Sequence, residues 1–512
     1  MVTESRVAKS VHNIKIALLF YVLNLLIQFV YRKIFLDHLG SEVLGLNTTA
    51  QNLLGFLNIA ELGIGSAVAY NLYKPLYDKN TEDINAIVSI QGWLYRRIAT
   101  IVIIGAIILM FFFPLIFTKA DLPLWYPYGA FIALLTSSLL SYFVNYKQIV
   151  LSADQKEYKV TTCVQGVKLI KITIQLLAIY FFENGYLWWI IIEILMAFVT
   201  SFILNKTIIH EYPWLMTNVS QGNILKNKYP EILRKTKQIF FHKIGSFVMG
   251  QTSTIIIYAF TSLTMVAIYG NYLLVISGMT LLVNSVFNSM DAGIGNLVAE
   301  GDKKKIKSVY WQISVLRIWI ASMVCYGLYI LSDRFITLWV GSEYILPHTT
   351  LIVLIINTFL GLIRNNDSFI NAYGLYSDIW APIIEATLNL SLSITLGYYL
   401  GLPGVLLGVC ISLSLVIHCW KPYFLYKYGF KENWTEYVLK YIKYFILIVL
   451  SFISCCFFFN KYIIISNASF IDWALYAIIM MFIYCVISFI LFYASDNSFR
   501  RFIKRIKNKH YN

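Results

Sequence analysis

Charged residues are scarce in this 512-residue sequence: Asp, Glu, Lys and Arg make up 13% of the chain, and hydrophobic residues make up 59%. Soluble domains average about 25% charged and about 45–50% apolar residues. The composition therefore excludes an ordinary water-soluble domain. It predicts an all-α membrane protein that crosses the bilayer many times, because helices satisfy their own backbone hydrogen bonds in lipid.

Motifs that would indicate an enzyme or a pump motor are also missing. The chain has no G-x-x-x-x-G-K-[ST] phosphate-binding loop, no H-E-x-x-H zinc motif and no Asp-x-Asp pair for a metal-bound sugar nucleotide. The seven cysteines form no C-x-x-C pattern, so a metal site or disulfide framework is not indicated. We expect no catalytic residue, no metal and no cofactor, and coupling to a proton or sodium gradient stays open.

Apolar runs of spanning length number about fourteen, six before and eight after a polar, Lys-rich interval at 206–238. They lie near 14–36, 42–73, 98–117, 126–147, 159–181, 187–205, 239–262, 266–299, 312–331, 347–373, 379–399, 403–420, 441–459 and 470–494. The net charge of +15 is concentrated in alternate loops, which indicates positive-inside insertion and not nucleic-acid binding. This pattern predicts a multi-pass protein of the cell (inner) membrane with both termini in the cytoplasm.

A stripe of polar residues runs through the otherwise apolar stretch 39–75. Asn47, Gln51, Asn58 and Glu61 follow one another at steps of four, seven and three, and at about 100° per residue they share one narrow helix face. Polar groups in hydrocarbon are costly unless they face protein or water. We therefore expect Asn47, Gln51 and Asn58 to line a polar cavity, whereas Glu61 either carries a coupling ion or packs against another helix.

An internal repeat relates the two halves. The segment NIAELGIGSAVA at 58–69 is echoed by NSMDAGIGNLVA at 288–299, where Asp291 takes the place of Glu61 and has the same two interpretations. An even number of spans per half predicts two pseudo-symmetric six-helix lobes related by an axis along the membrane normal. The predicted parts are an N-terminal lobe at 1–211, a cytoplasmic linker at 212–238, a C-terminal lobe at 239–426, and two further spans with a basic cytoplasmic tail at 427–512.

Cations lie deep inside two of the predicted spans. Lys168 and Lys171 lie roughly 14–18 Å into theirs at about 1.5 Å per residue, which is far for lysine to reach the surface, so we interpret both as cavity-lining groups. Arg364 either forms a structural ion pair, with Asp367 or with Glu385 of the next span, or binds an anionic headgroup through its guanidinium fork.

The other charged candidates are less specific. Asp367 and Glu385 could also serve in ion coupling or in packing. Arg32, at the outer end of the first span, is either an interfacial anchor or a headgroup ligand. Arg317, one to two turns into its span, is expected to extend to the membrane surface.

Several blocks of sequence resemble those of polysaccharide-unit flippases of the Wzx type. In the first half these are R-K-I-F-L-x-x-L-G-S-E-V-L-G-L-N at 32–47, A-E-L-G-I-G-S-A at 60–67 and L-Y-K-P at 72–75. In the second half they are R-N-N-D-S-F-I-N-A-Y-G-L-Y at 364–376, W-A-P-I-I-E-A-T-L-N-L-S-L-S at 380–393 and G-L-P-G-V-L-L-G at 401–408. The resemblance covers roughly 1–425. One departure is Asn365, which stands where a proline-containing turn is expected and leaves the local bend in doubt.

The resemblance implies the fold of the multidrug/oligosaccharidyl-lipid/polysaccharide (MOP) exporter superfamily, with alternating access to a central cavity. It implies a cargo of undecaprenyl-diphosphate oligosaccharide for O-antigen (lipopolysaccharide), capsule or exopolysaccharide. The expected surroundings are membrane lipid, a polysaccharide polymerase and a chain-length regulator. Two rival classes remain. A multidrug/cation antiporter of the same superfamily should have an acidic cavity with little Lys or Arg, and a polysaccharide polymerase or ligase should have a large outer loop.

Overall fold

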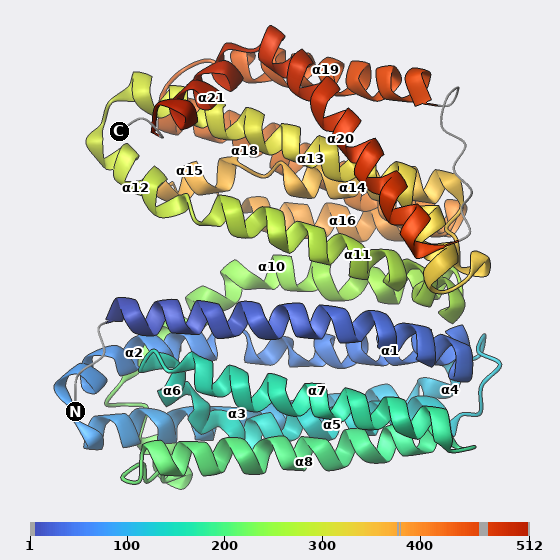
Figure 1. The fold of residues 1–512 in the computed structure, drawn as a ribbon. Coiled ribbons are helices and arrows are strands. Elements are labelled where there is room, and N and C mark those ends of the chain that lie inside the picture. Colours follow the sequence, from blue (N-terminus) through green and yellow to red (C-terminus); the bar gives the residue numbers. More distant parts are fainter. Residues whose placement is uncertain (1–5, 376–377, 379, 460–468, 510–512) are drawn as a thin grey trace. The chain divides into compact units, whose positions relative to one another are not determined.

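The computed structural model describes residues 6–375, 378, 380–459 and 469–509, and every regular element in these ranges is a helix (Figure 1). The chain forms two compact units, Met1–Ala267 and Ile268–Asn512. We call them the N-terminal unit and the C-terminal unit and describe each by itself.

Six long helices dominate the N-terminal unit, and the first is interrupted at Gly40. Gly40 has φ 81° and ψ 170°, a conformation that glycine adopts without a Cβ penalty, so α1 consists of two helices that meet there. The elements are α1 (Arg6–Leu57), η1 (Asn58–Glu61), α2 (Ile64–Asp78), α3 (Thr81–Phe111), α4 (Phe113–Ile116), α5 (Trp125–Phe143), η2 (Asn145–Gln148), α6 (Ile149–Ala153), α7 (Glu157–Phe181), α8 (Gly185–Glu211), η3 (Val219–Gln221), α9 (Gly222–Leu225) and α10 (Pro230–Phe260).

The boundary between the units falls inside α11, and the remaining elements belong to the C-terminal unit. They are α11 (Leu263–Asn288), α12 (Asp291–Glu300), α13 (Lys303–Trp339), η4 (Ser342–Tyr344), α14 (His348–Leu362), α15 (Asn366–Ala372), α16 (Trp380–Leu400), α17 (Leu402–Ser412), the π-helical turns η5 (Leu413–Trp420) and η6 (Leu425–Phe430), α18 (Lys421–Phe424), α19 (Thr435–Phe459), α20 (Phe470–Ser495) and α21 (Asn497–Lys509).

The two echoed sequence segments occupy equivalent breaks in the helices. In the N-terminal unit α1 ends at Leu57 and α2 begins at Ile64, with a 3₁₀ turn at Asn58–Glu61 between them. In the C-terminal unit α11 ends at Asn288 and α12 begins at Asp291. The repeat therefore marks the same structural event twice, the end of one long helix and the start of a shorter one.

A further interruption of a helix, in the C-terminal unit, contains no proline. The span that contains Arg364 is divided into α14 and α15, with Ile363–Asn365 outside either helix. Asn365 Nδ2 donates a hydrogen bond to Ser314 Oγ at 2.8 Å, and Asn365 is 2% exposed. The helix is thus interrupted at this place, and the hydrogen bond of a buried asparagine side chain stabilises the interruption.

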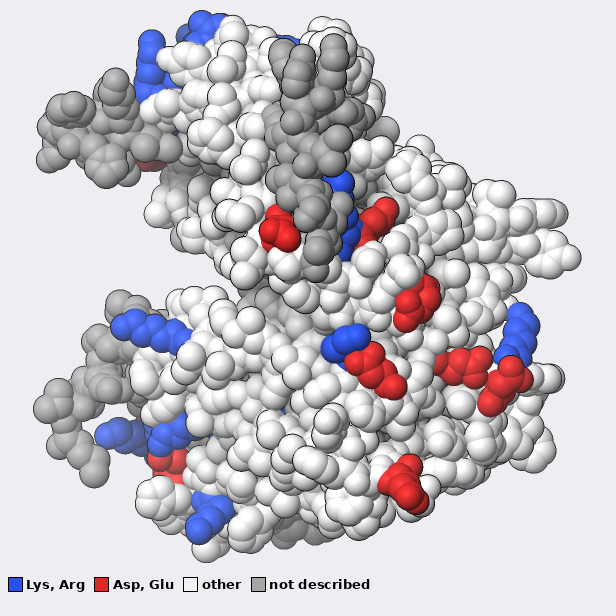
Figure 2. Space-filling view, turned by 45° about the vertical axis from the view of Figure 1, so that its right-hand side comes forward, with Lys and Arg blue, Asp and Glu red and all other residues white. Residues whose placement is uncertain are grey.

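Ten described helices are long and apolar enough to cross a membrane, or eleven if the bent pair Trp125–Phe143 and Asn145–Ala153 forms one span. The number of these helices is smaller than the fourteen apolar runs found in the sequence for three reasons. α1 counts once although Gly40 divides it into two helices, and α10 and α16 are helical but are not among these ten. Most of the face in Figure 2 is uncharged, as contact with lipid requires. The predicted all-α polytopic membrane fold is confirmed.

Candidate functional site

One of the two deep lysines of α7 is neutralised by a carboxylate on α8. Lys171 Nζ lies 2.6 Å from Glu193 Oε1, and the side chains are 22% and 7% exposed. Gln175, one turn further along α7, donates from Nε2 to Glu193 Oε2 at 2.9 Å. Glu193 thus binds two groups of α7. The positive charge of Lys171 is already balanced inside the N-terminal unit.

Lys168 differs from its neighbour. It is half-buried on α7, one turn before Lys171, and among the described residues it forms no ion pair. Gln165, three residues earlier, accepts a hydrogen bond from Asn24 Nδ2 of α1 at 3.2 Å. Together Lys168, Lys171 and Glu193 carry two positive charges and one negative charge, so this part of the N-terminal unit keeps one uncompensated cation at membrane depth.

Arg364 of the C-terminal unit shares a carboxylate with a second cation. Arg364 Nε and Nη2 donate to the same oxygen of Asp367, Oδ2, at 3.2 and 3.1 Å. Lys421 Nζ binds the other oxygen, Oδ1. Arg364 therefore forms the ion pair with Asp367 that was one of its two interpretations. Its side chain is nevertheless 36% exposed, and its fork is not matched to the two oxygens of a carboxylate.

Arg317 is buried and does not extend to the membrane surface. It is 5% exposed, its Nε donates to the carbonyl oxygen of Leu362, and its Nη2 donates to Asn284 Oδ1 at 2.8 Å. Its guanidinium also lies 4.9 Å from the centre of the Phe287 ring. The sequence-based expectation was wrong, because Leu362 ends α14 and its free carbonyl offers Arg317 a partner within the helix bundle.

A hollow lined by both apolar and polar side chains lies along α11, which carries the partner of Arg317. Its volume is about 600 Å³. Its polar wall consists of Ser277, Thr280, Asn284, Ser285 and Asn288. Asn288 is the counterpart of Asn58 in the sequence repeat. Because Asn284 touches Arg317, the hollow places hydroxyl and amide groups next to a buried guanidinium.

Two residues of the polar stripe, Asn47 and Asn58, accept hydrogen bonds from other helices of the N-terminal unit. Tyr186 donates its hydroxyl to Asn47 Oδ1 at 2.8 Å. Ser138 and Tyr142 of α5 donate to Asn58 Oδ1 at 3.1 and 2.9 Å. These bonds hold the stripe against α5 and α8, whereas Gln51, named above with it, is exposed.

The two repeated acidic residues lie in different surroundings. Glu61 Oε1 accepts a hydrogen bond from Tyr95 of α3 at 2.9 Å and is half-buried. Asp291 opens α12 and is exposed. The contact of Glu61 is of the packing kind, whereas Asp291 interacts electrostatically with Arg317.

Two further candidates lie apart from the lysine pair of α7. Arg32 Nη1 approaches the carbonyl oxygen of Ala267 at 3.5 Å. Glu385 of α16 is 6% exposed, and it interacts electrostatically with Arg364 and Lys421. Glu385 therefore belongs with Arg364, Lys421 and Asp367, which we call the Arg364 cluster and in which two positive charges meet two negative ones.

Sequence reasoning missed Glu193 and Lys421, and Glu193 left a clear signal. It is the single carboxylate in the apolar run 187–205. Lys171 and Glu193 are equally distant in sequence from Phe182, which caps the end of α7. Two antiparallel helices joined there bring these positions to the same depth. No group of His, Cys, Asp and Glu side chains suited to a metal ion occurs in the described ranges.

Comparison with solved structures finds transporters. A lipid II flippase, MurJ in its inward closed conformation, matches 93% of this chain and 99% of its own with a TM-score of 0.63 and 16% identity. A multidrug-resistance transporter of the MATE family and MOP superfamily, in an inward-facing conformation, matches 80% of this chain and 97% of its own with a TM-score of 0.54 and 14% identity. The chain has the fold of these transporters. No family model matches it, and no curated protein does.

Proposed function

We propose that the chain flips undecaprenyl-diphosphate-linked oligosaccharide units from the cytoplasmic to the outer leaflet by alternating access. The observation that carries the proposal is the uncompensated cation at Lys168. An unpaired charge inside a membrane is expensive, and intramembrane ionisable residues that persist mark a transport pathway. Lys168 is retained, in this proposal, because a diphosphate neutralises it during transport.

The charge of the lysine pair of α7 supports an anionic cargo. This pair has one positive charge in excess over Glu193, whereas in the Arg364 cluster Arg364 and Lys421 balance Asp367 and Glu385. A cation antiporter should instead have an excess of negative charge in its cavity. Lys171 and Asp367, whose charges are neutralised by ion pairs, would hold Lys168 and Arg364 in place. The hollow on α11 offers hydroxyl and amide groups that suit a sugar.

The structural comparisons favour a lipid-linked cargo over a drug. The lipid II flippase matches more of this chain than the multidrug transporter does, 93% against 80%. A cargo with a long lipid tail leaves the tail in the bilayer while its polar headgroup crosses, so only the headgroup needs a cavity.

The biological setting of the proposal follows from the cargo. The units would serve O-antigen, capsule or exopolysaccharide synthesis in the inner membrane, beside a polysaccharide polymerase and a chain-length regulator. Both termini would face the cytoplasm, and a proton or sodium gradient could supply the driving force. The protein performs no covalent step on the cargo in this scheme.

The decisive experiment measures surface polysaccharide in a strain that lacks its own flippase. The variant Lys168→Gln should lower surface polymer about tenfold or more, since a hydrogen bond to a charged group contributes about 1.5–3 kcal/mol, and protein level should not change. Lys168→Arg keeps the charge and should retain most of the activity. Full surface polymer in a Lys168→Gln, Arg364→Gln variant, together with resistance to cationic drugs, would instead establish the antiporter.

A further inference from the structure

A cavity unrelated to the cation clusters lies where η6 meets α19. Its volume is about 620 Å³, and its wall includes Tyr423, Lys427, Tyr428, Lys431 and Trp434. Three aromatic rings and two lysines thus surround one cavity in the C-terminal unit. Neither lysine forms an ion pair with any residue that the structure describes.

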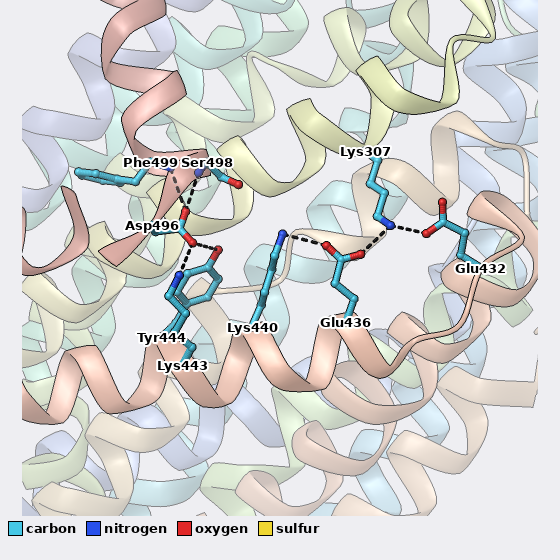
Figure 3. A network of polar contacts seen from close by, with 9 residues as sticks. All are labelled: Lys307, Glu432, Glu436, Lys440, Lys443, Tyr444, Asp496, Ser498 and Phe499. Carbon is cyan, nitrogen blue, oxygen red and sulfur yellow. Dashed lines mark hydrogen bonds and ion pairs between the residues drawn. The ribbon is translucent and has the colours of Figure 1, made fainter. Parts of the chain in front are cut away.

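The one carboxylate in the wall of this cavity is occupied elsewhere. Glu432 binds Lys307 of α13, and the same Lys307 Nζ lies 2.6 Å from Glu436 Oε2 (Figure 3). Glu436 in turn binds Lys440 at 2.9 Å. Because Lys307 and Lys440 neutralise these carboxylates, the two lysines of the cavity keep their positive charges available for a ligand.

The lysines and rings are arranged as a pocket and not as scattered side chains. Lys427 Nζ donates to Tyr423 Oη at 3.1 Å and lies 5.4 and 5.3 Å from the ring centres of Tyr423 and Tyr428. Trp434 meets Tyr423 edge to face at 6.0 Å. The ammonium group is thus held between rings, where cation–π attraction fixes its position.

The backbone of the turn helps to place the second lysine. Lys431 has φ 57°, in the left-handed region, where a residue with a Cβ is disfavoured. The next residue, Glu432, donates its backbone N–H to the carbonyl oxygen of Tyr426 at 3.0 Å. This bond and the ion pair of Glu432 with Lys307 hold the tight turn that carries Lys431.

The pocket lies at the membrane surface, because it joins the ends of two successive apolar helices, Leu402–Phe430 and Thr435–Phe457. Tyr and Trp are enriched at that level of a bilayer. Lysines beside them on the cytoplasmic side bind anionic lipid headgroups. We propose that this pocket binds the phosphate headgroup of an anionic bilayer phospholipid, with Lys427 and Lys431 on the phosphate. The proposal does not depend on what the chain transports.

The test is a titration of the purified full chain with short-chain phosphatidylglycerol, followed by native mass spectrometry. The variant Lys427→Gln, Lys431→Gln should bind about tenfold or more weakly, since each lysine near a membrane surface contributes about 1 kcal/mol. The matched control is Lys303→Gln, Lys304→Gln, which removes the same charge from two exposed lysines at the start of α13 and should bind as the unaltered chain does. Equal affinity in the two double variants overturns the proposal.

Two other ligands distinguish a lipid headgroup from a soluble phosphate as the occupant of this pocket. Phosphatidylcholine of the same chain length should bind weakly, because its headgroup has no net negative charge. Glycerol phosphate should bind more weakly than phosphatidylglycerol, because it has no tail to hold it at the membrane surface. If glycerol phosphate binds as tightly as the lipid, the pocket is a site for a soluble phosphate and the lipid assignment is wrong.

A measurement with both lysines in place covers the case in which the double variant does not fold. In nanodiscs, phosphatidylglycerol with brominated tails should quench Trp434 more strongly than brominated phosphatidylcholine does. Trp434→Phe should abolish that difference, which assigns it to this ring. Equal quenching by the two lipids, or a difference that survives Trp434→Phe, contradicts the proposal.

Discussion

Lys171 of α7 and Glu193 of α8 form an ion pair 2.6 Å long, while Lys168, one turn away, forms none with any residue that the structure describes. Two lysines that look equivalent in the sequence therefore have different environments. The pair stabilises the N-terminal unit, and the remaining lysine is available to an anion. This difference can be tested by comparing protein level with transport.

Lys171→Gln should lower the amount of folded protein, because removal of one partner leaves Glu193 charged, buried and unpaired. Loss of one partner of a buried pair costs about 3–5 kcal/mol. The double variant Lys171→Gln, Glu193→Gln should restore the level, and Lys168→Gln should not change it. Fluorescence-detected size-exclusion chromatography of a tagged chain gives the measurement. A Lys171→Gln chain as abundant as the unaltered one would contradict the assignment.

Asp367→Asn should lower the stability of the chain more than Arg364→Lys does. It should lower transport less than Arg364→Lys does. Without Asp367, Arg364 and Lys421 repel each other across the site that the carboxylate occupied. Arg364→Lys keeps the charge but loses the planar fork that suits phosphate, so surface polymer should fall with little loss of protein. The two measurements are surface polysaccharide and thermal stability in detergent. The opposite order of effects would make Arg364 a structural residue.

Glu61→Ala should destabilise the N-terminal unit by about 1–3 kcal/mol, because Tyr95 loses the acceptor of a half-buried hydrogen bond. Asp291→Ala, at the repeated position, should leave stability unchanged, because Asp291 is exposed. Thermal unfolding in detergent measures both. Loss of ion dependence of transport in Glu61→Gln, at a normal protein level, would show that Glu61 couples an ion instead.

The predicted orientation can be tested by labelling single cysteines in a chain without its own seven. Asp121→Cys should react from outside the cell with a thiol reagent that does not cross membranes, and Asn227→Cys should not. Both positions are exposed. Membrane vesicles of inverted orientation are the control, and there the two reactivities should exchange. Labelling of Asn227→Cys in intact cells would reverse the assigned topology.

The docking of α21 should weaken in acid. Burial alone would raise the pKa of Asp496, but Lys443 and the backbone N–H groups of Phe499 and Ser498 bind its carboxylate (Figure 3) and hold the pKa below its usual 3.8. Because the docked helix has the lower pKa, this stabilisation is complete above pH 3.8 and is lost as the pH falls through the lowered value.

A fluorophore at Lys504→Cys reports this change through its anisotropy, which should fall in that pH range. Asp496→Ala should show the low anisotropy at neutral pH, because it lacks the carboxylate. The control is Asn497→Ala, which alters the exposed neighbouring residue and should follow the unaltered chain. A pH-independent anisotropy would mean that Asp496 does not hold α21.

Much of the fold could be predicted from the sequence, because it depends on patterns that repeat along one chain. The echo of 58–69 at 288–299 indicated that the chain has two related halves, and the structure adds that a helix ends within each of these segments. The apolar runs located the helices, although a run cannot show that two of them join at Gly40. The site was harder to predict, because the partner of Lys171 depends on how α7 and α8 are rotated against each other. Depth identifies both lysines and places Glu193 level with Lys171, but it does not show whether the two side chains face each other.

The contact between α16 and α17 has a consequence for how the chain is made. A Cβ on Gly404 would lie 2.0 Å from the carbonyl oxygen of Leu396, so the two backbones touch. Asn389 donates to Ser412 Oγ at 3.3 Å, and Ser393 Oγ donates to the carbonyl oxygen of Val405 at 3.0 Å. Polar groups of α16 are thus satisfied only once α17 is beside it. During synthesis α16 should wait at the insertion machinery and enter the bilayer together with α17, as a helical hairpin.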